Sequence, residues 1–285
     1  MTEGTPVDLL GARKVAPFAP DLLQSTEHHL CSGCGHPVAW RLLIEVLEEL
    51  QLVDRSIGVV GHGCYTQIIT TADVEFLQCL HGRAPAVATG MKRMLPDRAI
   101  YTLQGDGDMV SEGLAEVLHA AARGESITCL MLDNGVFGDT GGQMTAATTV
   151  GQRTKTSLDG RSEQEHGYPI PVADIVASFP GAAYVARGAV DKPNAVARTR
   201  RYLREAFASQ LAGEGFSLVE VLTMCPTGWF IPTAEGPDYM TETLGEVHLM
   251  GELKVDGKIR TTEELHAENV QKQREIEEAL AQGGL

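Results

Sequence analysis

The chain has 285 residues, of which 43% are hydrophobic and 21% charged, and its formal net charge is −15. This composition is typical of a globular protein and excludes a disordered, collagen-like or coiled-coil chain. The acidic balance and the lack of a basic stripe predict no binding to nucleic acid. Because no apolar run reaches the roughly 18 residues of a membrane helix, and the first 20 residues do not resemble a signal peptide, we expect a soluble cytoplasmic protein with no membrane partner.

The first half of the chain predicts strands and helices in alternation. The alternation begins after residue 30, because residues 1–30 form a polar arm that shows no clear period. Short apolar runs indicate buried strands, longer segments with apolar residues at helical spacing indicate helices, and Gly124 is expected to cap a helix. The predicted strands are Ser56–Val60, Ala99–Leu103 and Ile127–Leu132, and the predicted helices are Val38–Leu52, Ala84–Met94 and Ser111–Arg123.

The second half continues the alternation before the pattern weakens. Helices are predicted at Val172–Phe179, Asn194–Leu211 and Thr262–Ala281, strands at Ala182–Val190 and Ser217–Thr223, and irregular structure over 226–262. Continuous apolar strands joined by helices are typical of a parallel sheet covered on both faces. We therefore expect an α/β fold with a doubly wound, mostly parallel sheet. The expected divisions are an arm over 1–30, one domain over 31–230, and an extension with a charged helix over 231–285.

Unusual loops follow four of the predicted strands, at the edge where open parallel sheets bind ligands. Two glycines flank Asp106, and Asn134 follows the next strand along the chain. Glycines let backbone N–H groups approach a phosphate, and oxygen ligands suit Mg²⁺ or Ca²⁺. A magnesium or calcium ion bridging a diphosphate is therefore predicted here, although Gly-Asp-Gly by itself also fits an ordinary turn.

Six cysteines lie along the chain, and an even count would suit disulfides only in a small secreted protein. Cys31 and Cys34 form a Cys-x-x-Cys pair, which suits a zinc knuckle, a redox pair or a cluster ligand pair. With Cys64 and Cys225, which both end strands at the ligand edge, four thiolates suit either Zn²⁺ or a [4Fe–4S] cluster. Cys79 and Cys129 lie in apolar surroundings and are predicted to be buried structural thiols; they complete the six.

The order of the sequence motifs along the chain indicates a protein family. They are Cys31-Ser-Gly-Cys-Gly-His36, Gly61-His-Gly-Cys64, Leu80-His-Gly-Arg-Ala-Pro-Ala-Val-Ala-Thr-Gly90, Gly105-Asp-Gly107, Thr140-Gly-Gly-Gln143 and Cys225-Pro-Thr-Gly228. Over about residues 28–230 the chain resembles the thiamine-diphosphate-binding β subunit of 2-oxoacid:ferredoxin oxidoreductases. The resemblance implies the pyrophosphate-domain fold that binds thiamine diphosphate.

The resemblance also implies roles for individual positions. The [4Fe–4S] cluster would be held by Cys31, Cys34, Cys64 and Cys225, and Mg²⁺ by the side chains of Asp106 and Asn134 and the carbonyl of Val136. The remaining cofactor contacts would come from His62, Gly63, Cys64, Tyr65, Gly82, Gly105, Gly107, Asp108, Gly138 and Asp139. Catalytic roles would fall to His62, His81 and Arg83, with a structural ion pair as the alternative for Arg83.

Three positions depart from the family pattern. Phe137 and Asp139 stand where the family often has Tyr and Met, and Ser32 stands where Pro is frequent. Phe137 keeps a ring but lacks a hydroxyl. Asp139 places a negative charge near a diphosphate, which is unfavourable unless the carboxylate is paired or turned away; any contact is therefore expected through its backbone.

The implied activity is the oxidative decarboxylation of a 2-oxoacid to acyl-CoA and CO₂, with electrons passed through the cluster to ferredoxin. Coenzyme A would be a co-substrate, and the 2-oxoisovalerate-type members resemble the Leu80–Pro85 stretch most. The implied partners are an α subunit, a γ subunit and a ferredoxin-like δ subunit or fused equivalents, because this chain shows no second α/β repeat. Two alternatives stay open: a non-redox thiamine-diphosphate decarboxylase or synthase subunit, and a zinc-stabilised binding subunit without catalysis.

Overall fold

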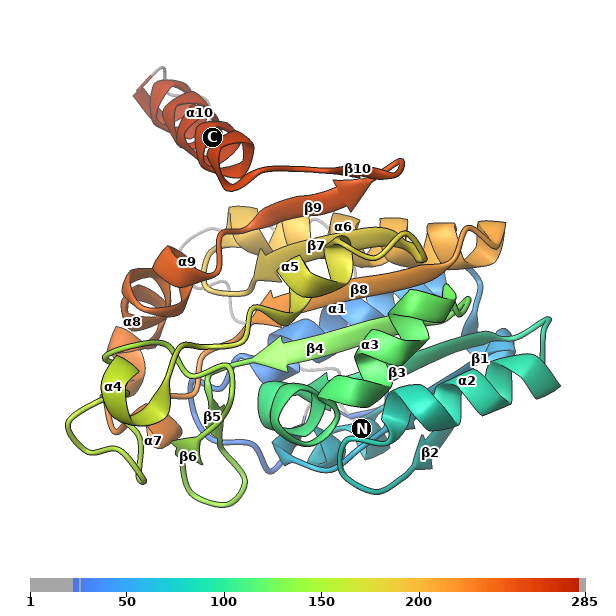
Figure 1. The fold of residues 1–285 in the computed structure, drawn as a ribbon, viewed down its shortest axis with the longest axis horizontal. Coiled ribbons are helices and arrows are strands. Elements are labelled where there is room, and N and C mark those ends of the chain that lie inside the picture. The colour runs from blue at the N-terminus through green and yellow to red at the C-terminus, as the bar shows by residue number, and fades with distance from the viewer. Residues whose placement is uncertain (1–22, 26, 282–285) are drawn as a thin grey trace, which may run out of the picture.

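A computed structural model describes residues 23–25 and 27–281 of the chain (Figure 1). Its central feature is an eight-stranded sheet with the order β10-β9-β7-β8-β4-β3-β1-β2. Six strands run parallel: β1 (Ser56–Val60), β2 (Phe76–Gln78), β3 (Ala99–Gly105), β4 (Thr128–Asp133), β7 (Ala182–Ala189) and β8 (Phe216–Leu222). At one edge β9 (Gly251–Val255) and β10 (Lys258–Ile259) continue the sheet in antiparallel pairs.

Helices cover both faces of this sheet. On one face lie α1 (His36–Glu49) and α6 (Pro193–Ala212), and on the other lie α2 (Ala84–Met94), α3 (Leu114–Arg123) and α5 (Val172–Ala177) (Figure 1). Each face has its own hydrophobic cluster: Trp40 and Phe207 belong to the first, Val117 and Val176 to the second. The doubly wound, mostly parallel sheet predicted from the sequence is therefore confirmed.

Local sequence explains where several helices begin and end. Proline stands in the first turn of α1, α2 and α6, where its missing N–H costs nothing. Helix α3 ends at Gly124, which adopts the left-handed conformation (φ +63°) and confirms the predicted C-cap. The predicted helix from Ser111 begins later, because a π-helical turn over Gly107–Glu112 precedes α3. Such turns are frequent at functional sites.

The prediction of irregular structure over 226–262 is wrong. The segment contains α7 (Pro226–Trp229), α8 (Gly236–Glu242), α9 (Leu244–Val247) and strands β9 and β10. These elements are too short to show a hydrophobic period, and the strands form because β9 pairs with the exposed edge of β7. The sheet thus extends past residue 230. The three-residue strand β2 was missed for the same reason.

The remaining elements lie outside the central layers. A small hairpin pairs β5 (Val136–Phe137) with β6 (Gln143–Met144), and α4 (Glu163–His166) follows it. Helix α10 (Thr262–Ala281) extends away from the sheet beyond β10 (Figure 1). No helix in the described part of the chain is long and apolar enough to cross a membrane. Most of the arm predicted over 1–30 lies outside the described residues.

Candidate cofactor and cluster site

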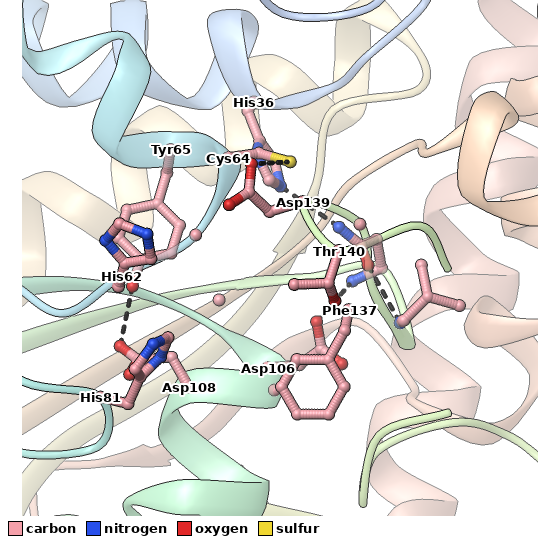
Figure 2. Close-up of a pocket in the computed structure, with 16 residues that line it drawn as sticks. His36, His62, Cys64, Tyr65, His81, Asp106, Asp108, Phe137, Asp139 and Thr140 are labelled. Carbon is pink, nitrogen blue, oxygen red and sulfur yellow. Dashed lines mark hydrogen bonds between the residues drawn. The ribbon is translucent and has the colours of Figure 1, made fainter. Parts of the chain in front are cut away.

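A cavity of about 280 Å³ opens at the carboxyl edge of the sheet (Figure 2). Loops after β1, β3 and β4 supply most of its lining, because the carboxyl ends of neighbouring parallel strands meet at one edge. The lining residues are His36, His62, Gly63, Cys64, Tyr65, His81, Gly105, Asp106, Gly107, Asp108, Asn134, Val136, Phe137, Gly138, Asp139 and Thr140. Of the predicted cofactor contacts, only Gly82 is absent from this lining.

Asp106 and Asn134 form the buried oxygen-bearing corner of the cavity. The Thr145 hydroxyl donates to Oδ2 of Asp106 at 2.6 Å, and the Asn134 backbone N–H donates to Oδ1 at 3.4 Å. Oδ1 of Asn134 accepts the Val136 N–H at 3.0 Å, which folds this loop into a tight turn. Burial of the Asp106 carboxyl raises its pKa to about 7. The corner therefore holds a carboxylate that a bound cation would stabilise.

Glycine is required at position 107 for close packing. A Cβ atom added there would lie 2.3 Å from the ring of Phe137, so the ring packs directly against the backbone of Gly107. At Gly105 the nearest neighbour of an added Cβ is the Tyr65 ring, at 3.4 Å. The two aromatic rings thus flank the Gly-Asp-Gly turn and leave its backbone exposed to the cavity.

Asp108 plays a structural part in the cavity floor. Its Oδ2 accepts hydrogen bonds from the Tyr65 hydroxyl at 2.8 Å and from the Gln104 amide at 3.0 Å, and its Oδ1 accepts the Gly82 N–H at 2.5 Å. Gly82 itself has φ +71° and lies against the backbone of Glu112. The carboxylate therefore ties the loop after β2 to the loop after β3.

Of the three predicted catalytic side chains, two line the cavity and one does not. The rings of His62 and His81 meet edge to face with centroids 5.2 Å apart, and both line the cavity. His81 Nδ1 lies 3.0 Å from Glu112 Oε2. Arg83 does not line the cavity; its guanidinium pairs with Glu116, the structural alternative that the sequence left open.

The four predicted cluster cysteines come together in a second cavity of about 150 Å³ beside the first. Cys31 and Cys34 precede α1, Cys64 follows β1 and Cys225 follows β8. The two cavities share five lining residues, namely His36, Cys64, Asn134, Gly138 and Asp139. A site for four thiolates and a site for an oxygen-ligated cation therefore lie side by side.

Burial and mutual proximity set the state of these thiols. Burial raises the pKa of Cys34 and of Cys64 to about 12, and that of Cys225 to about 11. Charge repulsion from neighbouring cysteines, and from Asp139 at Cys64, contributes a smaller part of these same increases in pKa. The thiols of Cys34, Cys64 and Cys225 are thus protonated at neutral pH, and a metal bound there would have to displace their protons.

The two other cysteines do not line either cavity. Cys129 is fully buried on β4, as predicted. Cys79 is only half-buried, so the prediction of burial is wrong there. It follows β2, which is the outermost strand at that edge of the sheet in the described part of the chain. Its thiol donates to the Val60 carbonyl at 3.3 Å.

Sequence reasoning did not identify Thr145 or Gln67 at the site, and it gave His36 either a capping or orienting role or a cofactor contact. His36 Nε2 lies 3.3 Å from Nδ2 of Asn134, and Thr145 contacts Asp106 across 39 positions of the chain. Gln67 lines the cysteine cavity. Among these, only His36 carried a signal, because it directly follows the Cys-Ser-Gly-Cys-Gly motif.

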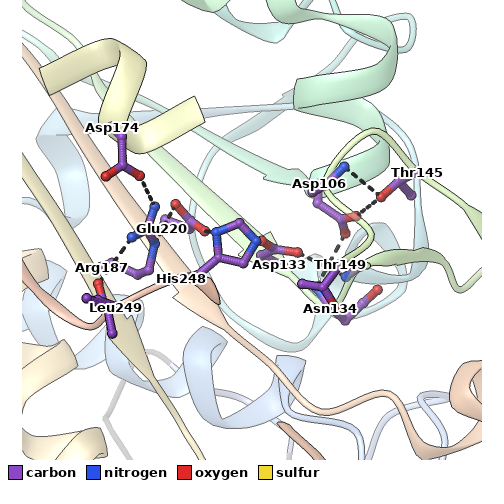
Figure 3. Close-up of polar contacts among 12 residues, drawn as sticks. Asp106, Asp133, Asn134, Thr145, Thr149, Asp174, Arg187, Glu220, His248 and Leu249 are labelled. Atoms are coloured by element: carbon purple, nitrogen blue, oxygen red, sulfur yellow. Dashed lines mark hydrogen bonds and ion pairs between the residues drawn. The ribbon is translucent and has the colours of Figure 1, made fainter. Parts of the chain in front are cut away.

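A buried charged network lies beside Asp133, the residue before Asn134 (Figure 3). Arg187 on β7, 1% exposed, places Nε 2.9 Å from Glu220 Oε2 and donates to Asp174 Oδ2 at 2.7 Å. His248 Nδ1 lies 3.8 Å from Glu220 Oε1. Burial together with nearby carboxylates raises the pKa of Asp133, the neighbour of Asn134. The network joins β4, β7, β8 and the segment before β9.

Comparison with known proteins assigns a class to this arrangement. Residues 61–221 match the family described as "Thiamine pyrophosphate enzyme, C-terminal TPP binding domain", and thiamine pyrophosphate is another name for thiamine diphosphate. A solved 2-oxoglutarate:ferredoxin oxidoreductase from Magnetococcus marinus shares the fold, with a TM-score of 0.67 over 90% of both chains at 23% identity. The chain belongs to the thiamine-pyrophosphate-binding class of proteins.

Curated relatives place the chain more narrowly. It is 32% identical over 75% of its length to the 2-oxoacid:ferredoxin oxidoreductase subunit beta of a Sulfolobus species, covering 68% of that protein. It is 34% identical to the 2-oxoglutarate synthase subunit KorB of Archaeoglobus fulgidus, covering 72% of each chain. The chain therefore belongs to the family of 2-oxoacid:ferredoxin oxidoreductase β subunits.

Another relative is the ketoisovalerate oxidoreductase subunit VorA of Methanothermobacter thermautotrophicus, 37% identical over 71% of this chain. This chain spans 42% of the length of that subunit.

Proposed function

We propose that this chain is the cofactor-binding β subunit of an enzyme that oxidatively decarboxylates a 2-oxoacid to acyl-CoA and CO₂ and passes the electrons to ferredoxin. The observation that carries the proposal is the adjacency of two cavities, one lined by Asp106 and Asn134 and the other by four cysteines. An enzyme that couples decarboxylation to single-electron transfer needs its cofactor next to an electron acceptor. Family membership supports the same function.

The oxygen-bearing corner fits Mg²⁺. A carboxylate, an amide oxygen and a backbone carbonyl are hard donors of the kind Mg²⁺ prefers, and Asp106, Asn134 and Val136 supply them. Burial of an uncompensated carboxylate at Asp106 is unfavourable without a cation. Asp106, Asn134 and the carbonyl of Val136 would hold the ion, and the ion would hold the diphosphate of the cofactor.

The sulfur-lined cavity fits a [4Fe–4S] cluster better than zinc. A tetrahedral zinc ion with Zn–S bonds of about 2.3 Å holds its sulfurs roughly 3.8 Å apart. In the described part of the chain, the groups of three or more candidate ligand atoms within 4.8 Å of one another include none of these cysteines. Four thiolates spread around a cavity suit the larger cluster. Cys31, Cys34, Cys64 and Cys225 would be its ligands.

Bound thiamine diphosphate would supply a nucleophilic carbanion and an electron sink for decarboxylation. The chain's own residues bind and orient it. The Gly105–Gly107 backbone lines the cavity and would hold the diphosphate end, and Tyr65 and Phe137 enclose the turn. His62 and His81 line the same cavity and would act as hydrogen-bond partners of the substrate or cofactor. Cys64 lines both cavities, so the path from cofactor to cluster is short.

Other subunits would complete the enzyme. The described part of the chain contains one eight-stranded sheet and one two-stranded hairpin. It therefore contains no second α/β unit for cofactor binding. An α subunit would supply the carboxylate at the aminopyrimidine ring and the substrate pocket. A γ subunit and a ferredoxin-like δ subunit, or fused equivalents, would complete the electron path to ferredoxin. Coenzyme A would be the co-substrate, as in the Magnetococcus marinus enzyme, whose structure contains coenzyme A and succinyl-CoA.

Two relatives indicate the class of 2-oxoacid. The relative with 37% identity is named for ketoisovalerate, and the one with 34% identity for 2-oxoglutarate. We place branched-chain 2-oxoacids first and 2-oxoglutarate second.

Anaerobic purification of the chain with its co-expressed partner subunits tests the function. Iron and acid-labile sulfide are quantified first, and a panel of 2-oxoacids is then assayed with coenzyme A and a viologen dye. The expected result is cluster iron with coenzyme-A-dependent dye reduction by one or a few 2-oxoacids. Zinc without iron would contradict the cluster, and decarboxylation without dye reduction would identify a non-redox enzyme.

A further inference from the structure

Asp139 lies between the two cavities and lines both of them. Its Oδ1 is 3.9 Å from Cys64 Sγ and accepts a hydrogen bond from the Gln67 side-chain amide at 3.3 Å. Figure 2 shows the Asp139 carboxylate beside Cys64 and His36. The carboxylate is therefore turned toward a cysteine sulfur.

The backbone around Asp139 is also held against the sulfurs. An added Cβ atom at Gly138 would lie 3.4 Å from Cys225 Sγ and 3.5 Å from Cys64 Sγ. Within the described ranges, 23–25 and 27–281, no lysine or arginine forms an ion pair with Asp139. Its negative charge thus faces the sulfur-lined cavity without a neutralising cation.

We propose that Asp139 lowers the reduction potential of the [4Fe–4S] cluster bound at Cys64. The proposal rests on the proposed function, because it requires the cluster. Reduction adds one electron to the cluster and neither forms nor breaks a bond to protein. A fixed negative charge beside the cluster disfavours the added charge, and net charge and hydrogen bonding are known controls of cluster potential.

Gln67 keeps the carboxylate in place when Cys64 becomes a thiolate. The bound thiolate no longer donates a hydrogen bond, so the Cys64–Asp139 contact becomes a repulsion between two negative groups. The hydrogen bond from Gln67 does not depend on the cysteine proton and remains. Asp139 therefore contributes negative charge near the cluster in both oxidation states, and it acts as a tuning residue without ligating iron.

The test is a redox titration of the full chain, purified anaerobically and carrying its cluster. Dithionite is the reductant, and the electron paramagnetic resonance signal of the reduced cluster reports the midpoint potential at neutral pH. Asp139→Asn preserves shape and removes the charge. We expect its potential to shift to more positive values, with iron and sulfide per chain equal to wild type.

Further variants separate charge from structure. Asp139→Glu keeps the charge and is expected to stay closer to the wild-type potential than Asp139→Asn. Asp159→Asn removes an exposed carboxylate that lines neither cavity, and it is expected to leave the potential unchanged.

An unchanged or more negative potential in Asp139→Asn overturns the proposal. Weaker thiamine diphosphate binding at an unchanged potential would instead assign Asp139 to the diphosphate and overturn it equally. If Asp139→Asn loads no cluster, Asp139→Ser decides by the same criterion. Wild-type chain without iron contradicts the proposed function itself, and this result is distinct from a loaded cluster that does not respond to Asp139.

Discussion

The two neighbouring cavities are built in different ways. Asp106 and Asn134 follow adjacent parallel strands, and hydrogen bonds from Thr145 and the Asn134 backbone hold Asp106 before any ligand binds. The cysteines come from three separate places: the segment before α1, the loop after β1 and the loop after β8. Their polar contacts are few, as in the 3.9 Å approach of Cys64 to Asp139.

The two sites therefore gain their geometry from different sources. Strand register places the oxygen donors, so the fold itself pre-forms the corner. The thiols are placed by loops and a helix start, and a bound cluster is expected to complete their geometry, since metal binding and folding are coupled. Substitutions of single ligand residues should therefore affect the two cavities independently. Four experiments test this independence, the buried charged network and the pre-formed oxygen corner.

Removal of one thiol is expected to have the largest effect. Cys34→Ser should lose nearly all cluster iron, because four thiolates are needed to hold the cluster. Thiamine diphosphate binding should be retained, because Cys34 lines only the cysteine cavity. Iron analysis and calorimetric titration with thiamine diphosphate and Mg²⁺ measure both. Cys79→Ser is the matched control; loss of iron in that variant would contradict the assignment of ligands.

Loss of the buried Arg187 guanidinium should lower the stability of the fold. Arg187→Leu leaves Glu220 buried without its cation, which costs about 3–5 kcal/mol of unfolding free energy. Urea denaturation measures the loss. Arg200→Leu on α6 removes a partly exposed guanidinium that pairs with Glu45 and Glu49, and it should cost at most about 1 kcal/mol. Equal losses in the two variants would show that the network beside Asp133 has no special role.

Removal of the Asp106 charge should disable the oxygen-lined cavity alone. Asp106→Asn is expected to weaken Mg²⁺-dependent binding of thiamine diphosphate by more than about 100-fold, since loss of a ligand exceeds the 10–100-fold effect of an outer-shell change. Cluster iron should stay at the wild-type level. Asp159→Asn serves as the control. Parallel loss of iron in Asp106→Asn would refute the independence of the two cavities.

A smaller effect is expected from the hydroxyl that supports Asp106. Thr145→Val keeps the side-chain shape and removes the 2.6 Å hydrogen bond to Oδ2. Affinity for Mg²⁺ and thiamine diphosphate should fall about 10-fold, at the lower end of outer-shell effects. Thr89→Val is the control, because the buried Thr89 hydroxyl bonds to the Pro85 carbonyl and the residue lines neither cavity. Unchanged affinity in Thr145→Val would mean that strand register alone orients Asp106.

Much of the fold was predictable because its signals are local. Helix α2 and helix α10 were predicted with the bounds that the structure shows, and continuous apolar runs identified β1, β3, β4, β7 and β8. The short strands β2, β9 and β10 were not predictable, because they form only by pairing with an existing sheet edge. The oxygen corner was predicted from strand order, whereas the hydrogen bond from Thr145 to Asp106 spans 39 positions and leaves no local signal.

The sequence by itself determined the alternating elements, the ligand edge of the sheet, and the residue types that bind there, because periodicity and donor chemistry are written in neighbouring residues. Only the tertiary structure decided that four cysteines from three segments line one cavity, that Arg83 pairs with Glu116 outside it, and that Asp139 faces Cys64. These outcomes depend on where loops distant in sequence meet, and chain packing sets that.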